Sequence, residues 1–356
     1  MLRKVSLSFT GMFMMFSAFA QTDSLPAPAP APALTITGSA DVYYKYDFLK
    51  NAGNGLTSFT STHDQFALGM ASVKFEHKTS KVDMVADLGF GKRAMDFAYN
   101  DNGILAAVKQ LYISYSASEH VKFTAGSWAT HVGYELVDPQ LNRNYSMSYM
   151  FTNGPFTHTG LKADFTFGKS GLMVGVANPT DYRIVPDGVM NKKFILAQYS
   201  YAASDKFKAY LNFVGGKGTD TTKNFQVDLV LTSKLSDKFS IGYNGTINNS
   251  KFWITSSKSY TSSMSWWGSA LYLNLDPKPN FGLTLRGEYF SDKYAIKLPA
   301  GGNILAATLS ANIKVDGFTF IPEFRIDNSN VFNFANDKGV AKKSAPSLII
   351  AAVYAF

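Results

Sequence analysis

The sequence contains no cysteine, which excludes disulfide bridges and thiolate metal sites. Beyond residue 20 it lacks any run of about 18 apolar residues, so we expect no helix to span a membrane. No glycine-rich loop of the phosphate-binding kind follows a strand and opens a helix. The five histidines lack the spacing of a metal site on one strand: His63, His77, His120, His131 and His158. From the absence of these features we expect the protein to bind neither a cofactor nor a metal.

Aromatic residues and dispersed charge are abundant instead. The chain has 29 Phe, 19 Tyr and 4 Trp, and a formal net charge of +8. Its lysines and arginines occur singly along the chain rather than in a stripe, which argues against a nucleic-acid partner. Mean hydropathy is −0.05. A closed sheet with one face in lipid and the other in water gives such an average, because its two faces cancel.

The first 20 residues have the organisation of a secretory signal peptide. Arg3 and Lys4 form a basic start, residues 5–19 are mostly apolar, and the small residues Ala18 and Ala20 precede the expected cleavage after residue 20. A membrane anchor is the alternative, but Ser, Thr and Gly interrupt the apolar stretch, so it would span poorly. No cysteine follows the cleavage point, which excludes lipid attachment there. We expect export and cleavage, with Gln21 as the first mature residue.

A proline-alanine repeat follows at residues 26–33. Alternating proline favours an extended polyproline II conformation and cannot join a β-ladder. We interpret residues 21–33 as a semi-rigid periplasmic spacer, with docking of a partner as the alternative.

From Leu34 onward, apolar and polar residues alternate in many segments, among them 34–48, 225–231 and 239–247. A period of two with one apolar face predicts strands with one face in an apolar medium. The last such segment, 348–356, ends on the aromatic Phe356. This ending is typical of the closing strand of bacterial outer-membrane barrels, which the barrel-assembly machinery reads. A core strand at the end of a soluble domain is the alternative.

Short and long polar connections alternate along the same region. Seven short turns are expected near residues 79–81, 118–119, 169–171, 204–206, 236–238, 276–280 and 316–317. Eight longer connections are expected at 49–65, 93–106, 129–156, 178–192, 215–223, 248–265, 291–303 and 327–345. Four turns are followed at once by an aromatic, as an interfacial girdle requires: Phe207, Phe239, Phe281 and Phe318. The pattern predicts an all-β transmembrane antiparallel barrel of about 16 strands (14 to 18 are compatible), with short periplasmic turns and long extracellular loops.

The polar rows of these strands are then expected to face the lumen. Charge on the lipid face is costly, whereas a wide, water-filled barrel keeps it hydrated. The predicted inward charges are Lys45, Lys74, Lys109, Lys122, Lys162, Lys208, Arg286, Arg325, Asp41, Glu76, Asp83, Asp87, Asp164, Asp228, Glu288, Glu323 and Asp327. Positive and negative groups are nearly balanced, which argues against a strong ion preference.

The longest connection, 129–156, is the candidate constriction. We expect it to fold into the pore and set the size limit, carrying the side chains of Tyr134, Glu135, Asp138, Arg143 and Tyr145. An ordinary surface loop is the alternative.

Several short motifs in and around this connection resemble one family. They are Gly126-Ser127-Trp128, Gly133-Tyr134-Glu135, Asn144-Tyr145-Ser146, Gly154-Pro155-Phe156 and His158-Thr159-Gly160. With the start at Gly38 to Tyr44 and the aromatic end, the stretch from Leu34 to Phe356 resembles the OmpL-like β-barrel porins. The resemblance implies an outer-membrane porin and names no solute. The family usually has a proline after the first motif, where this chain has Ala129-Thr130-His131.

These observations favour a single barrel domain over residues 34–356, located in the bacterial outer membrane, that is not an enzyme. We expect passive diffusion of small hydrophilic solutes through a hydrated lumen. Outer-membrane lipid, lipopolysaccharide and the assembly machinery are the expected partners, and a homo-oligomer is compatible with the sequence. Two alternatives remain: a barrel hydrolase, using His131 with Glu135 or Asp138, and a closed structural or adhesive barrel.

Overall fold

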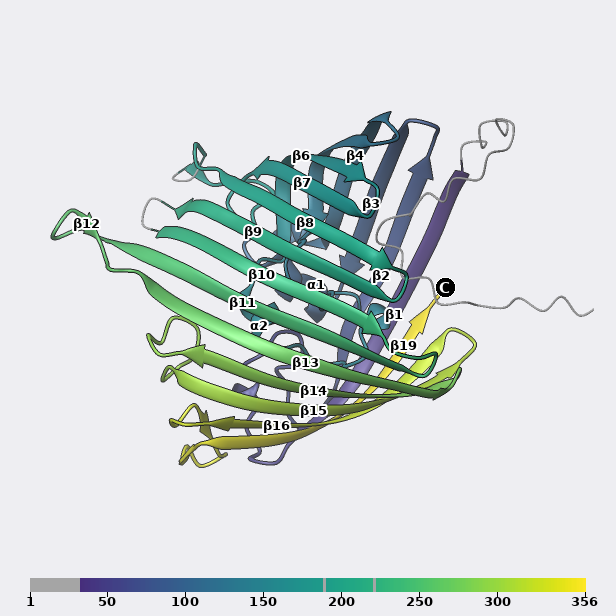
Figure 1. Cartoon of the computed structure of the whole chain (residues 1–356). Helices are drawn as coiled ribbons and strands as arrows, with labels where there is room; N and C mark the ends of the chain where they lie inside the picture. Colours follow the sequence, from purple (N-terminus) through teal and green to yellow (C-terminus); the bar gives the residue numbers. More distant parts are fainter. Residues whose placement is uncertain (1–32, 188–189, 220–221) are drawn as a thin grey trace, which may run out of the picture.

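The computed structural model describes residues 33–187, 190–219 and 222–356. The expected signal peptide and residues 21–32 of the expected spacer lie outside this part. Within it, sixteen long antiparallel strands form one closed sheet (Figure 1). They are β1 (Ala33–Asp47), β2 (Gln65–Lys78), β3 (Val82–Phe90), β4 (Val108–Ser118), β5 (Val121–Ala129), β6 (Thr157–Phe167), β7 (Ser170–Ala177), β8 (Phe194–Ser204), β9 (Phe207–Thr219), β10 (Thr222–Lys234), β11 (Phe239–Ile254), β13 (Met264–Lys278), β14 (Phe281–Asp292), β15 (Gly302–Val315), β16 (Phe318–Ser329) and β19 (Ser344–Ala355).

The remaining elements belong to the connections. Short strands are β12 (Ser259–Tyr260), β17 (Phe334–Ala335) and β18 (Ala341–Lys342). The helices are α1 (Lys92–Ala98) and α2 (Tyr149–Asn153), with 3-10 turns at Ala52–Asn54, Gly103–Ala107 and Pro139–Leu141. None of the helices among the described residues is long or apolar enough to cross a membrane.

The first and last strands close the sheet. β1 pairs with β2 on one edge and with β19 on the other, from Ser39 opposite Ala355 to Asp47 opposite Ser347. In Figure 1 the purple first strand accordingly lies beside the yellow last strand. Closure leaves no edge strand, so every strand finds its hydrogen-bond partners within the sheet. The predicted barrel of 16 strands is thus confirmed.

The expected two faces are present along each strand. In β1 the side chains of Asp41, Tyr43 and Lys45 are buried, whereas that of Val42 is 45% exposed. The apolar row therefore lies on the outside, where lipid would cover it, and the charged row faces inward.

All seven predicted short turns separate strands at the expected places. Phe207, Phe239, Phe281 and Phe318 each begin a strand, at the end where those turns lie. These four aromatic residues therefore lie at the same end of their strands, as an aromatic girdle at the membrane interface requires.

Two predicted connections were wrong in extent. Residues 215–223 were expected to form a long connection, but β9 continues to Thr219 and β10 begins at Thr222. Similarly, β11 continues to Ile254 within the expected connection 248–265. Polar residues continue these ladders because, beyond the apolar band, both faces of a strand can meet water.

Candidate pore constriction

A segment of 27 residues between β5 and β6, residues 130–156, lies inside the barrel and is called the inner loop here. It leaves the wall after Ala129 and rejoins it at Thr157, which are paired across the two strands. Tyr145, Met147 and Tyr149 in its middle are buried, at no more than 1% exposure. The inner loop therefore packs against the wall instead of extending into solvent.

Two wall carboxylates bind the backbone of the inner loop. Glu323 of β16 accepts hydrogen bonds from the amides of Tyr145 (2.7 Å) and Ser146 (3.1 Å). Glu288 of β14 accepts from the amides of Tyr149 (3.0 Å) and Met150 (3.1 Å). Both carboxylates are buried. Hydrogen bonds to a charged acceptor are about twice as strong as neutral ones, so we call these two contacts the carboxylate clamps.

Two wall arginines bind the carbonyl groups of the same stretch. Arg286 of β14 donates to the carbonyl of Ser146 (2.8 Å) and pairs with Glu135 of the inner loop. Arg325 of β16 donates to the carbonyl of Met147 (2.6 Å) and forms a bidentate pair with Asp327. Each buried arginine thus has a carboxylate partner, as buried ions require, whereas Glu288 and Glu323 are satisfied by backbone amides.

The inner loop also extends toward the end of the barrel that carries the short turns, which we call the short-turn rim; the opposite end is the long-loop rim. Arg143 donates to Asp276 of β13 (2.6 and 3.1 Å) and to Thr284 of β14 (2.7 Å). Asp276 lies two residues before the end of β13 at a short turn. Since the inner loop starts at the opposite rim, it passes through most of the barrel height.

The inner loop shares a hydrophobic core with two other connections. Phe59 from residues 48–64 and Phe97 of α1 pack with Phe156, at ring-centroid distances of 5.8 and 5.6 Å. The full cluster is Phe59, Phe97, Val137, Met147, Phe151 and Phe156. We call it the loop core, because it contains no strand residue. Its charged edge is the guanidinium of Arg93, which lies 4.9 Å from the ring of Phe59 and 4.7 Å from that of Tyr145.

Sequence reasoning did not identify Arg93, Phe59 or Phe97. Arg93 is fully buried, donates to the carbonyls of Val137 and Tyr145, and approaches Asp41 at 3.9 Å. An amphipathic period in residues 92–98 was the available signal, but seven residues give a weak one. That segment was expected to be an extracellular loop.

The residues predicted to line the pore fall into two groups. Ten are buried: Asp41, Lys45, Asp87, Lys109, Asp228, Arg286, Glu288, Glu323, Arg325 and Asp327. The other seven lie on the wall of β2 to β9 and keep contact with solvent: Lys74, Glu76, Asp83, Lys122, Lys162, Asp164 and Lys208. Among the first group, Lys109 holds Asp138 of the inner loop, and Asp228 accepts from the amide of Gly133 (3.0 Å). The inner loop therefore contacts the wall at β4, β10, β14 and β16.

Three of the four lysines on the solvent-exposed wall are paired with carboxylates, and Lys208 is the fourth. Lys74 pairs with Glu76 (3.0 Å), Lys122 with Asp83 (2.8 Å) and Lys162 with Asp164 (3.1 Å). Pairs of this kind present little net charge to a passing solute.

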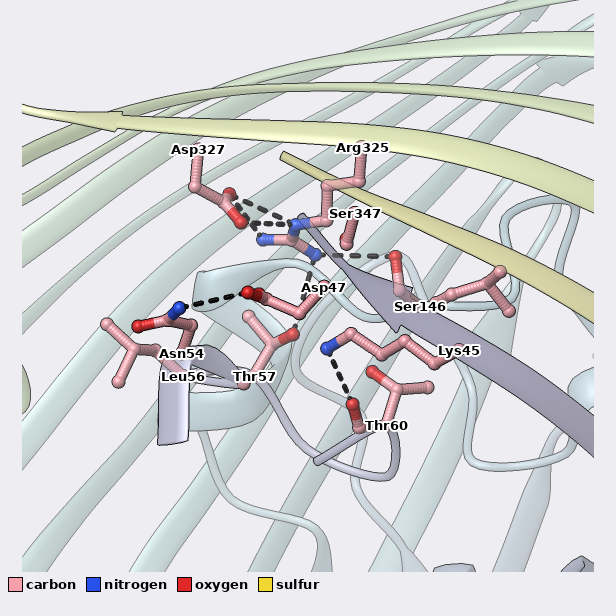
Figure 2. A pocket seen from close by; sticks show the side chains of 12 residues that line it. Lys45, Asp47, Asn54, Leu56, Thr57, Thr60, Ser146, Arg325, Asp327 and Ser347 are labelled. Atoms are coloured by element: carbon pink, nitrogen blue, oxygen red, sulfur yellow. Dashed lines mark hydrogen bonds and ion pairs between the residues drawn. The ribbon is translucent and has the colours of Figure 1, made fainter. Parts of the chain in front are cut away.

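A small polar cavity of about 10 Å³ lies where the connection 48–64 and Ser146 of the inner loop meet β1, β16 and β19 (Figure 2). Lys45 donates to the carbonyl of Thr60 (2.7 Å) at its edge, and Arg325 with Asp327 forms its roof. This volume accommodates about one water molecule. On this side the wall and the connections are thus closely packed.

At the long-loop rim, Asp181 fixes the point where the inner loop rejoins the wall. Its carboxylate accepts from the amides of Phe156 (2.7 Å) and Thr157 (2.8 Å). Burial raises the pKa of this carboxyl to about 6, although the two amides act in the opposite direction. The base of the inner loop is held by this carboxyl.

The residues considered for acid-base chemistry are not brought together. His131 interacts through Nε2 with the carbonyl of Phe213 (3.2 Å), and burial lowers its pKa to about 4. Glu135 instead pairs with Arg286, and Asp138 with Lys109. The arrangement thus gives His131 no carboxylate partner from this pair. Among the described residues, no group of three or more His, Asp or Glu side chains could hold a metal ion.

Gly126, in the first motif at the base of the inner loop, has a conformation that only glycine adopts easily. Its φ is +132°, and a Cβ would lie 2.3 Å from the carbonyl oxygen of Leu111. We expect Gly126→Ala to lower the free energy of unfolding by about 1–3 kcal/mol. Urea unfolding of the folded barrel, followed by tryptophan fluorescence, measures this.

Gly287→Ala is the matched control, because a Cβ at Gly287 of β14 would meet no atom within 4 Å. Equal unfolding midpoints for the two variants would contradict the strain assigned to Gly126.

Solved outer-membrane proteins share this architecture. The outer membrane channel DcaP of Acinetobacter baumannii superimposes with a TM-score of 0.62 at 13% identity, covering 91% of this chain and 97% of that one. An anion-selective porin from Comamonas acidovorans gives 0.61 at 11% identity, covering 92% and 100%. Outer-membrane OmpT of Vibrio cholerae gives 0.57 at 10% identity, covering 93% and 99%. At identities this low, the structural similarity shows a common fold and nothing further.

No curated protein sequence matches the chain significantly. A family model does match, over residues 33–356, and its description is "Putative beta-barrel porin-2, OmpL-like". This span includes every strand of the barrel and the inner loop. The chain therefore belongs to the OmpL-like beta-barrel porin-2 family.

Proposed function

We propose that this outer-membrane porin admits small hydrophilic solutes by passive diffusion, and that the inner loop limits their size. The observation that supports the size limit is the inner loop's position within the barrel, bound to β14 and β16 by the carboxylate clamps. Sixteen strands alone enclose a wide aqueous channel. Solutes would then pass between the inner loop and the solvent-exposed wall of β2 to β9.

The charges along this path predict weak ion selectivity. The half-exposed lysines Lys74, Lys122 and Lys162 each have a carboxylate partner within about 3 Å. Selectivity in a pore follows width and uncompensated lining charge. Size is therefore expected to discriminate among solutes more than charge does.

Reconstitution tests this function directly. In planar bilayers the purified protein should give ohmic conductance steps with similar permeability for K⁺ and Cl⁻. In liposome swelling, rates should fall steeply across sugars and amino acids of increasing size. The absence of both steps and swelling would overturn the proposal.

A closed structural barrel is the second candidate, and the loop core favours it, because aromatic side chains fill part of the interior. The same bilayer recording separates the two functions, since a sealed barrel gives no steps.

Family membership places the protein in the outer membrane, among lipid and lipopolysaccharide. Cleavage of residues 1–20 and recognition of β19 by the assembly machinery remain predictions. Mass spectrometry of the mature protein checks the first, since its N-terminus should be Gln21.

A further inference from the structure

Three lysines from adjacent strands lie side by side at the long-loop rim. Lys223 of β10 is directly opposite Lys217 of β9 on one side and Lys251 of β11 on the other. All three are exposed. We call them the lysine row. They share the outer face with Phe225, two residues after Lys223, which is 44% exposed in the apolar surface.

No carboxylate among the described residues pairs with these lysines. Like charges directly opposite one another on adjacent strands destabilise a sheet. None of the ion pairs between residues that the structure describes involves a member of the lysine row. The ammonium of Lys223 instead lies 4.1 Å from the ring centre of Tyr260 in β12, which packs against Trp253. This contact orients one charge without neutralising it.

The lysine row stands just above the apolar band of the barrel. On β11 the outward apolar row runs from Phe239 to Ile247, about 26 Å along the strand at roughly 3.3 Å per residue. With the tilt of barrel strands, this corresponds to about 20 Å across the membrane, close to the expected apolar height. Lys251 lies four residues beyond Ile247. The row is therefore at the level of lipid headgroups, on the side of the long loops, which face outward in such barrels.

We propose that the lysine row binds the phosphate groups of an anionic glycolipid of the outer leaflet. Three ammonium groups on neighbouring strands offer a diphosphorylated headgroup several charge-assisted contacts, and such contacts remove the repulsion between the lysines. The apolar side chains below, including Phe225 and Ile247, contact the acyl chains. This site depends on the membrane position of the barrel and is independent of conduction through the lumen.

The test compares two triple variants of the full chain in detergent. Lys217→Gln/Lys223→Gln/Lys251→Gln removes the row. Its matched control, Lys206→Gln/Lys238→Gln/Lys314→Gln, removes three exposed lysines at the short-turn rim. Native mass spectrometry, with EDTA present, measures the affinity for diphosphoryl lipid A and for its dephosphorylated form.

We expect the row variant to bind diphosphoryl lipid A roughly 10- to 100-fold more weakly than the wild type, and the control to bind it normally. The dephosphorylated lipid should bind all three proteins equally and weakly. Equal affinity of the row variant and the wild type would refute the site, and so would equal binding of the two lipids by the wild type. If millimolar inorganic phosphate displaced the lipid, the lysine row would be a site for free phosphate, and the proposal of a lipid ligand would be refuted. Heat-dependent electrophoretic mobility confirms that each variant is folded, and unchanged conductance separates the result from the channel.

Discussion

Deletion of residues 136–150 is expected to raise single-channel conductance several-fold. This deletion removes the part of the inner loop bound by both carboxylate clamps, including Tyr145 and Tyr149. The remaining wall encloses an aqueous channel of the width that 16 strands give. Recordings in planar bilayers at fixed salt measure the change, and larger sugars should now swell liposomes.

The design of this deletion follows from the structure. The cut ends are Glu135 and Phe151. Glu135 accepts a hydrogen bond from the amide of Ser148 (2.8 Å), and the hydroxyl of Ser148 accepts one from the amide of Phe151 (3.0 Å). The two ends are therefore near each other, and a short glycine-serine linker can join them. Deletion of residues 255–258, at the exposed tip beyond β11, is a control that should leave conductance unchanged. Unchanged conductance after removal of 136–150 would show that the inner loop does not limit the pore.

The second large effect is expected from breaking both carboxylate clamps with Glu288→Gln/Glu323→Gln. The two carboxylates accept four backbone hydrogen bonds in total, and bonds to a charged group contribute about 1.5–3 kcal/mol each. Losing even about 3 kcal/mol would shift an equilibrium between the bound and the released inner loop by roughly 100-fold. Frequent transitions to a higher conductance level should therefore appear in single-channel records.

Glu76→Gln is the matched control for this variant. It also neutralises a wall glutamate, but Glu76 is partly exposed and pairs with Lys74 of the same strand. We expect a steady conductance near that of the wild type. If the double variant were equally steady, the clamps would not be what holds the inner loop in the lumen.

The fold was predictable from the sequence because barrel strands obey local rules. A period of two specified which face of each strand meets lipid, and seven compact polar turns specified the strand count. The extent of strands beyond the membrane was not predictable in this way. Lys217 of β9 and Lys223 of β10 are directly opposite each other in the sheet, although their segment is polar enough to resemble a loop.

The candidate site was predictable only in part. Glu135, Arg143 and Tyr145 belong to the segment predicted to narrow the pore, which stays a prediction. Their partners lie more than 100 residues away in sequence and were not predicted. No local pattern specifies that Glu323 binds the amide of Tyr145. Arg93 was missed for the same reason, since its burial depends on three connections folding together.

The pairing of β1 with β19 has a consequence for how the molecule forms. Ser39 and Ala355 are neighbours in space but are separated by almost the entire chain. Contacts of such high sequence separation form slowly, because the entropy of closing the intervening chain must be lost first. Until they form, both end strands present unpaired backbone groups that invite aggregation. Folding of this barrel is therefore expected to depend on partners that shield its open edges until the last strand has arrived.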